Sequence, residues 1–156
     1  MSYKYYQKDL NTILESEIFG IELFKQAAKV SQQPDRKQKW QTLQALEQQT
    51  LDRLHAFLEE NNQTASSRFY IPLKGKVLGH VLGKLPWSIS MYLLKDGTTP
   101  FMQAFERLLE HASPNTKLFF EYVLAHEESI YQFAQAELKK KKASSLASVE
   151  LLLAKT

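Results

Sequence analysis

Cysteine is absent from this chain of 156 residues. Its absence excludes disulfides, thiolate zinc sites, iron–sulfur clusters and cysteine nucleophiles, so any metal chemistry must rest on carboxylates and the four histidines. Glycine and proline are scarce, with five of each, which favours helices over β structure with many turns. No apolar run is long enough to cross a membrane, and lysines near the N-terminus stand where a signal peptide needs apolar residues. We therefore expect a soluble cytoplasmic protein.

The residues that are present are those of a folded domain. Hydrophobic residues make up 44% of the chain and aromatic residues 12%, which excludes a disordered chain. The length suggests one domain over residues 1–156, large enough to bury a real core. The 20 basic residues barely outnumber the 17 acidic ones. Because no binding motif and no interleaving of aromatic and basic residues is present, nucleic-acid binding is not expected.

Apolar residues recur at three- and four-residue steps along the first part of the chain, which is the spacing of amphipathic helices. This spacing predicts helices over residues 3–31 and 34–60. Pro34 stands where a proline belongs in the first turn of the second helix. Two long helices joined by so short a link predict an antiparallel hairpin.

The second half of the chain contains several signals that break helices. Asp96-Gly97 predicts a turn, and Thr99-Pro100 and Ser113-Pro114 each read as a helix cap followed by a first-turn proline. We therefore expect a short helix between these two prolines and a long helix over residues 114–140. A last short helix would follow near the C-terminus.

The segment over residues 61–95 contains no acidic residue. Its positive charges are Arg68, Lys74, Lys76, Lys84 and Lys95. Gly75, Gly79 and Gly83 stand four apart on one helix face, and Pro86 is expected to kink or end that helix. Glycines inside a helix cost about 1 kcal/mol each, so they indicate that another backbone or a ligand comes close. The open alternatives are a homodimer contact, peripheral contact with an anionic membrane, and close packing within the chain, which is favoured.

Three glutamates interrupt the apolar stripes of the predicted helices. Glu17, Glu47 and Glu127 each lie three or four residues from apolar neighbours on both sides, and His126 adjoins the third. A buried carboxylate costs several kcal/mol unless it is paired or coordinated, and a divalent cation is one partner that would balance the charge. The alternatives are that each glutamate reaches water at a helix end, is protonated, or pairs with a lysine or arginine.

Two stretches of the chain carry a resemblance to a known family. The residues that carry it are Glu17, Phe24, Ala27-Ala28, Trp40 and Glu47, then Ala125-His126-Glu127-Glu128, Phe133-Ala134 and Glu137-Leu138. This pattern resembles the first two helices and the final helix of the ferritin-like superfamily. The resemblance implies a four-helix bundle in which glutamates and two ExxH motifs bind a di-iron centre.

The chain departs from that family at the histidines. Thr50 and Ile130 stand where the two ExxH motifs need imidazoles, and the segment over residues 61–95 lacks the glutamate expected on a third helix. Glu106 could replace it only if its helix lines the core. We therefore expect an all-α, ferritin-like up-down four-helix bundle with a kinked third segment, an extra short C-terminal helix and no standard di-iron centre.

Two functions stay open at this stage, one of them enzymatic. Because both imidazole positions are lost, the sequence favours a binding or interaction module that forms a homodimer or holds an apolar or anionic small ligand. The alternative is a metal-binding oxidoreductase or metal-handling protein. Its ligands to iron or another divalent ion would be Glu17, Glu47, His126 and Glu127.

Overall fold

The structure is a computed structural model that describes residues 3–140 and 144–155. Over these residues the chain is all-α, as predicted, and has no strand. The helices are α1 (Tyr6–Val30), α2 (Pro34–Glu60), α3 (Ile71–Lys84), α4 (Trp87–Glu110), α5 (Lys117–Leu138) and α6 (Ala147–Leu153). Within the described part of the chain, no helix combines the length and the apolar character that crossing a bilayer requires.

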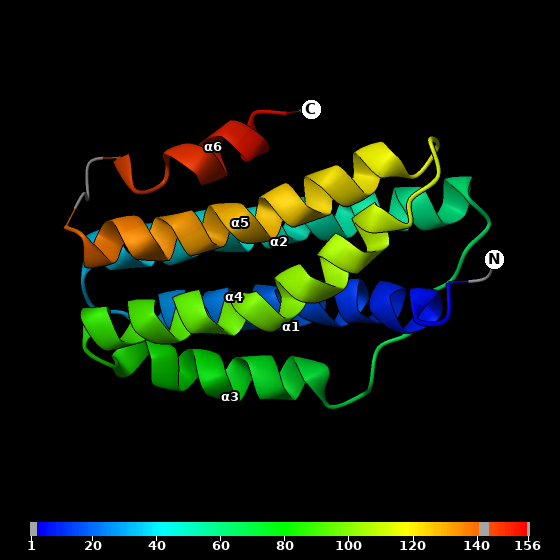
Figure 1. The fold of residues 1–156 in the computed structure, drawn as a ribbon. Coiled ribbons are helices and arrows are strands. Elements are labelled where there is room, and N and C mark those ends of the chain that lie inside the picture. The colour runs from blue at the N-terminus through cyan, green and yellow to red at the C-terminus, as the bar shows by residue number, and fades with distance from the viewer. Residues whose placement is uncertain (1–2, 141–143, 156) are drawn as a thin grey trace.

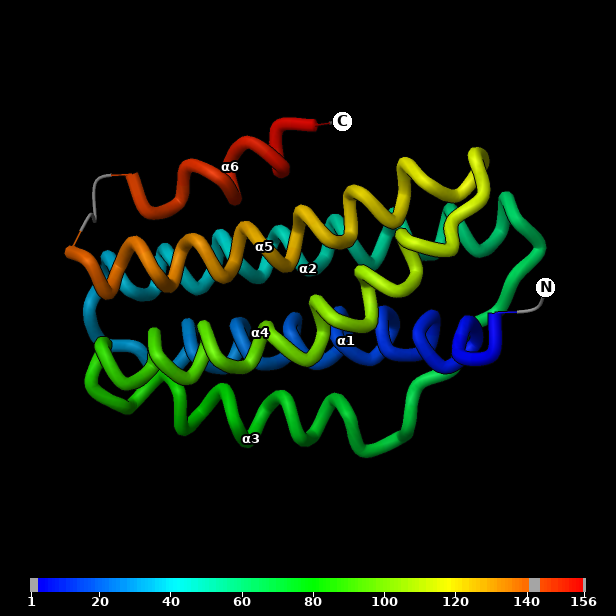
Figure 2. The backbone as a smooth tube through the Cα atoms, in the orientation of Figure 1, coloured from blue at the N-terminus to red at the C-terminus, as the bar shows by residue number. Residues whose placement is uncertain are grey.

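Four helices form the central bundle, and the other two cover it from outside. Figure 1 shows α1 and α2 at the back, with α4 in front of α1 and α5 in front of α2, while α3 and α6 lie on opposite sides of this group. The α1–α2 and α4–α5 pairs run antiparallel, and the first pair is the hairpin that the sequence predicts. The tube in Figure 2 shows that α2 and α4 run in the same direction, because α3 carries the chain back along the bundle between them. Helix α3 is therefore a crossover connection.

This placement corrects the prediction for the third bundle helix. The glycine-containing segment was expected to fill that position, but α4 fills it instead. Helix α4 continues through Asp96-Gly97 and Thr99-Pro100, where the sequence predicts a turn and a new helix. Pro100 cannot donate a hydrogen bond to the carbonyl of Asp96, yet both residues are exposed, so that carbonyl can reach water. The bend lies in the second half of α4 (Figure 2), and Pro86 ends α3 by standing at the cap of α4.

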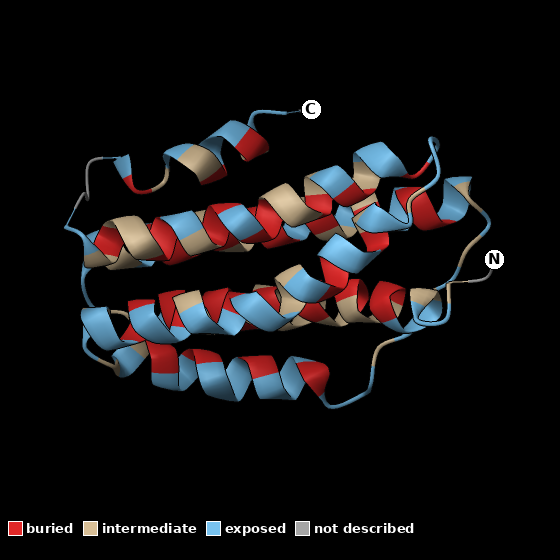
Figure 3. Cartoon of the chain, in the orientation of Figure 1, coloured by how far each residue is buried: buried red, intermediate tan, exposed pale blue. Residues whose placement is uncertain are grey.

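Burial explains why α4 overrides its local turn signals. Apolar residues on both sides of Pro100 face the interior of the bundle, and Met91, Phe105 and Leu108 are almost completely buried. Each such side chain contributes roughly 1.5–3 kcal/mol when it leaves water, so together they exceed the ~3 kcal/mol that an interior proline costs. Figure 3 shows the same arrangement along the bundle, with buried residues on the faces that the helices turn toward one another.

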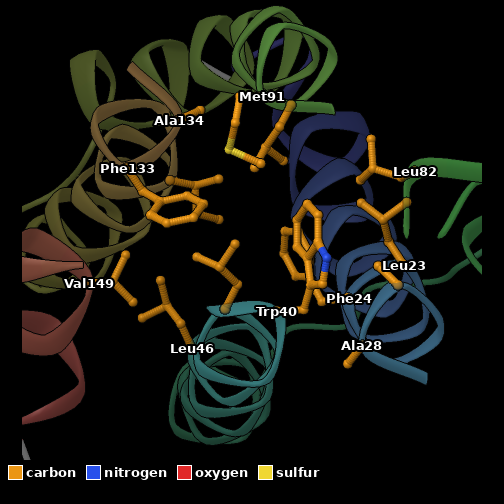
Figure 4. Packing of buried hydrophobic residues seen from close by; sticks show 14 of the residues in the cluster. Leu23, Phe24, Ala28, Trp40, Leu46, Leu82, Met91, Phe133, Ala134 and Val149 are labelled. Carbon is orange, nitrogen blue, oxygen red and sulfur yellow. The ribbon is translucent and has the colours of Figure 1, made fainter. Parts of the chain in front are cut away.

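The apolar core is divided into two clusters along the bundle. One surrounds Phe24 and Trp40, whose rings stack with centroids 5.8 Å apart, and is shown in Figure 4. The other surrounds Phe57, Phe105 and Phe120 near the opposite end. On each of α1, α2 and α5, a predicted site glutamate lies between the residues of one cluster and those of the other. These glutamates are Glu17, Glu47 and Glu127. The bundle therefore holds a polar layer between two apolar ones.

The glycine row lets α3 lie directly on the backbone of α1. A Cβ atom at Gly75 would stand 2.6 Å from the carbonyl oxygen of Phe19, and one at Gly79 would overlap the carbonyl of Leu23. Gly83 meets the backbone of the next turn of α1 in the same way. The close approach that the glycines indicate is thus satisfied inside the chain, as the favoured alternative predicts. The row gives no argument for a homodimer.

Candidate metal centre

The structure brings all four predicted site residues into the polar layer. Glu17 comes from α1, Glu47 from α2, and His126 and Glu127 from adjacent positions on α5. Glu17 and His126 are completely buried, and Glu47 and Glu127 are 3% and 5% exposed. The helical spacing that placed each residue on an apolar stripe is therefore the reason that three helices deliver them to the same depth.

The imidazole of His126 stands between the carboxylates. Its Nε2 atom lies 3.3 Å from Oε2 of Glu47 and 3.6 Å from Oε2 of Glu17, and its Nδ1 atom lies 3.8 Å from Oε2 of Glu127. Both ring nitrogens, and the Oε2 atoms of Glu17 and Glu47, have no hydrogen-bond partner among the described residues. A buried polar atom without a partner costs about 1–3 kcal/mol, so the layer is incomplete as a purely structural arrangement.

Three of these side chains can bind one cation together. Glu17, Glu47 and His126 each offer a ligand atom within 4.8 Å of the other two. Two atoms bound to one ion at ~2.1 Å lie roughly 3.0–3.6 Å apart when the angle at the ion is about 90–120°. The separations of 3.3 and 3.6 Å from Nε2 fit this range. Nε2 of His126 and the Oε2 atoms of Glu17 and Glu47, which have no hydrogen-bond partner, are thus the atoms that a metal ion would bind.

Burial also changes the acidity of the three glutamates. It is the largest cause that raises the pKa of Glu47 and of Glu127 to about 8, and it raises the pKa of Glu17 well above its ordinary value. The charge of one neighbouring carboxylate raises each of these pKa values further, whereas His126 opposes the rise for Glu17 and Glu127, and the Glu17 side chain opposes it for Glu47. Burial therefore favours the protonated form of these carboxyl groups.

The stability of the metal-free protein is expected to fall as the pH rises. The folded chain keeps protons on Glu47 and Glu127 up to a pKa of about 8, while the unfolded chain releases them near the ordinary value of 4.5. Between about pH 5 and pH 8 the unfolded state binds fewer protons, so the free energy of unfolding decreases with pH. Urea unfolding of chelator-treated protein at several pH values measures this slope. A stability that rises across this interval would contradict the prediction.

The two positions at which the ferritin-like resemblance predicts imidazoles are used for other purposes. The hydroxyl of Thr50 donates to the carbonyl of Leu46 at 2.9 Å and lies 3.1 Å from the hydroxyl of Tyr122. Ile130 belongs to the apolar cluster around Trp40. Glu106 was considered as a substitute ligand on the condition that its helix lines the core. Helix α4 does line the core, but Glu106 itself is exposed and does not reach the site. Among the described residues, the group able to hold a metal is the one set of Glu17, Glu47 and His126.

Glu127 plays a different part from the other two glutamates. It faces Nδ1 of His126, the nitrogen on the opposite side of the ring from Glu17 and Glu47. Histidines that bind metal through one nitrogen usually donate the other N–H to a carboxylate or carbonyl, which fixes the tautomer and the ring orientation. Glu127 stands on the side of the ring where such an acceptor would lie, although its Oε2 atom is 3.8 Å from Nδ1, beyond hydrogen-bond distance.

Gly20 is a site residue that the sequence analysis missed. It lies one turn after Glu17 on α1, and a Cβ atom there would stand 2.5 Å from Cδ of Glu47. The missing side chain therefore makes the space in which the Glu47 carboxylate lies. The sequence signal that could have identified Gly20 is a glycine in the middle of a long predicted helix, three residues after a glutamate that faces the core.

Comparisons of the chain with protein-family models, curated proteins and solved structures find no match. The interpretation of the site therefore depends on its geometry. Glu17 and Glu47 are 30 positions apart in the chain, and Glu47 and His126 are 79 positions apart. The fold nevertheless brings the three side chains together.

Proposed function

We propose that this chain is a metal-binding protein of ferritin-like type that holds one divalent ion between Glu17, Glu47 and His126. The observation that carries the proposal is the convergence of three buried ligand atoms, from three helices, that have no hydrogen-bond partner. Two ionised carboxylates would neutralise a doubly charged cation, which removes the energetic reason for protonating them.

The topology supports the ferritin-like part of the proposal. Ferritin-like bundles contain one long crossover connection, and they bind metal through side chains that project inward from facing helices. Helix α3 is such a crossover between α2 and α4, and the candidate ligands project from α1, α2 and α5. The chain differs from the family in offering ligands for one ion, because both imidazoles of the ExxH motifs and a carboxylate from α4 are missing.

The donor atoms favour a first-row transition metal. Calcium and magnesium prefer sites built from oxygen alone, whereas an imidazole together with carboxylates suits iron, manganese or zinc. Three protein ligands leave coordination positions open, as catalytic sites do and closed structural sites do not. We therefore favour Fe²⁺ or Mn²⁺ and an oxidoreductase or metal-handling role, in which the bound ion supplies redox chemistry or an open position for a further ligand.

Anaerobic titration of chelator-treated protein with Fe²⁺, Mn²⁺ and Zn²⁺ tests the proposal. We expect saturation at one ion per chain for at least one of these metals, and loss of that binding in Glu17→Gln, which keeps the shape of the side chain but removes its charge. Glu106→Gln is the matched control, because this exposed glutamate lies outside the site. Failure of all three metals to bind, or equal binding by Glu17→Gln, would refute the proposed function.

A further inference from the structure

An apolar pocket of about 280 Å³ reaches the polar layer from the side of the bundle. Side chains and backbone of α1, α3 and α4 form most of its wall, and Glu47 and Glu127 are its only charged lining residues. Both are buried, whereas Leu78, Val81 and Leu93 of the wall are 43–52% exposed. The pocket therefore leads from the surface beside α3 and α4 to the carboxylates of the candidate metal centre.

The size and the lining of the pocket restrict what it can hold. An apolar cavity of ~150 Å³ accommodates benzene, so the present volume suits roughly ten carbon atoms. Small-molecule pockets begin at about 300 Å³, are mostly apolar and contain few polar groups that fix the ligand. An anionic group at the inner end would meet no basic side chain, because the residues that line the pocket include none. The inner part of the ligand is therefore uncharged and apolar.

The surface next to the pocket carries a positive charge as well as apolar side chains. A second, shallower hollow shares Leu78 with the pocket and is lined by Leu73, Lys74 and Val77 of α3 and by Tyr70, the residue before it. The ammonium group of Lys74 lies 6.0 Å from the ring centre of Phe19, which is itself part of the pocket wall. A positive charge at the rim and an apolar interior match an anionic head group attached to an alkyl chain.

We infer that the pocket binds an anionic amphiphile, with its alkyl chain inside and its head group at the rim beside Lys74. This inference rests on the proposed function, because it places the end of the alkyl chain next to the candidate metal centre. It thereby names the class of substrate on which that centre would act. The amphiphile can reach the pocket as a free fatty acid or from an anionic bilayer. Both sources present the same alkyl chain and the same negative charge.

Gly97 offers a way to close the pocket without disturbing the fold. It lines the pocket in the middle of α4, and a Cβ atom there would meet nothing within 4 Å. A leucine at this position would project into open space at the mouth. Alanine adds one carbon to the same helix and leaves most of the space free, so Gly97→Ala is the matched control for Gly97→Leu.

Calorimetric titration with decanoate, below its micelle concentration, tests the inference. We expect binding by the unmodified protein and by Gly97→Ala, and at least a tenfold weaker affinity in Gly97→Leu. Lys74→Ala should weaken decanoate binding but not the binding of decanol, which has the same chain without the charge. Absence of decanoate binding, or equal affinity in Gly97→Leu and Gly97→Ala, would overturn the inference.

Two further experiments distinguish the possible sources of the ligand, and distinguish failure of the pocket proposal from failure of the metal proposal. Cosedimentation with phosphatidylglycerol vesicles that decanoate reverses would assign the ligand to a bilayer, and decanoate binding without cosedimentation would assign it to the free acid. Both results uphold the pocket. The titrations are repeated on metal-free and metal-loaded protein, so that decanoate binding without metal binding refutes the metal centre alone. Metal binding without decanoate binding refutes the pocket alone.

Discussion

Replacing Glu47 by glutamine is expected to weaken metal binding by at least about 100-fold while leaving the metal-free protein as stable as before, or more stable. Glutamine keeps the volume of the side chain but carries no charge, and loss of a group that merely supports a ligand already costs about 10–100-fold in affinity. In the metal-free chain, burial raises the pKa of Glu47 to about 8. The folded state therefore favours the neutral form that glutamine imitates.

The two effects of Glu47→Gln have opposite signs, and this separates a functional site from a structural one. If the carboxylate served only stability, its replacement would lower the free energy of unfolding of the protein and would leave the metal affinity unchanged. Calorimetric metal titration measures the first effect, and urea unfolding of chelator-treated protein at pH 8 measures the second. Metal binding by Glu47→Gln that is as tight as that of the unmodified protein, or strong destabilisation of this variant without metal, would contradict a metal-binding role for Glu47.

Replacing Glu137 by alanine is expected to destabilise the protein by about 3 kcal/mol, through a buried ion pair outside the candidate metal centre. Oε1 of Glu137 lies 2.7 Å from the ammonium of Lys39, and its Oε2 atom accepts a hydrogen bond of 2.8 Å from the indole of Trp87. Burial alone would raise the pKa of Glu137. The hydrogen bond from Lys39 and those from other donors together outweigh burial, so the pKa of Glu137 is lowered. Removal of one partner from a buried pair costs ~3–5 kcal/mol because the other charge stays buried.

The lower end of that range applies because Lys39 keeps a second partner. Asp35 lies 3.1 Å from the ammonium of Lys39, but its own side chain is 71% exposed and contributes little. Urea unfolding measures the loss in Glu137→Ala. The double variant Lys39→Met with Glu137→Leu should recover most of the stability, since it removes both charges and refills the space. A double variant that is less stable than Glu137→Ala would contradict this explanation.

The sequence predicted the bundle where the local pattern and the tertiary environment agree. Helix α2 begins at Pro34 and ends at Glu60, the same residues that the prediction named, because a first-turn proline and a continuous apolar stripe act together. At α4 the two disagree, and the helix continues through Gly97 and Pro100. Turn residues report only local preference, whereas the burial of Phe105 depends on helices that lie far away in the chain.

The candidate site also contains features that the sequence predicted and features that it could not predict. The positions of Glu17, Glu47 and His126 on apolar stripes predicted that they face the core, and this expectation is confirmed by their burial. The pocket could not be predicted, because it depends on how α3 crosses beside α4 and on the absence of a side chain at Gly97. Spacing along one helix determines which face a residue occupies. It does not determine which other helix covers that face.

Anomalous diffraction from crystals of metal-loaded protein, recorded at the absorption edge of the bound metal, tests the central claim most directly. We predict one anomalous peak per chain, within about 2.0–2.3 Å of the carboxylates of Glu17 and Glu47 and of Nε2 of His126. No peak at this position, a peak only elsewhere on the chain, or two peaks within the bundle would contradict a site for a single ion in the polar layer.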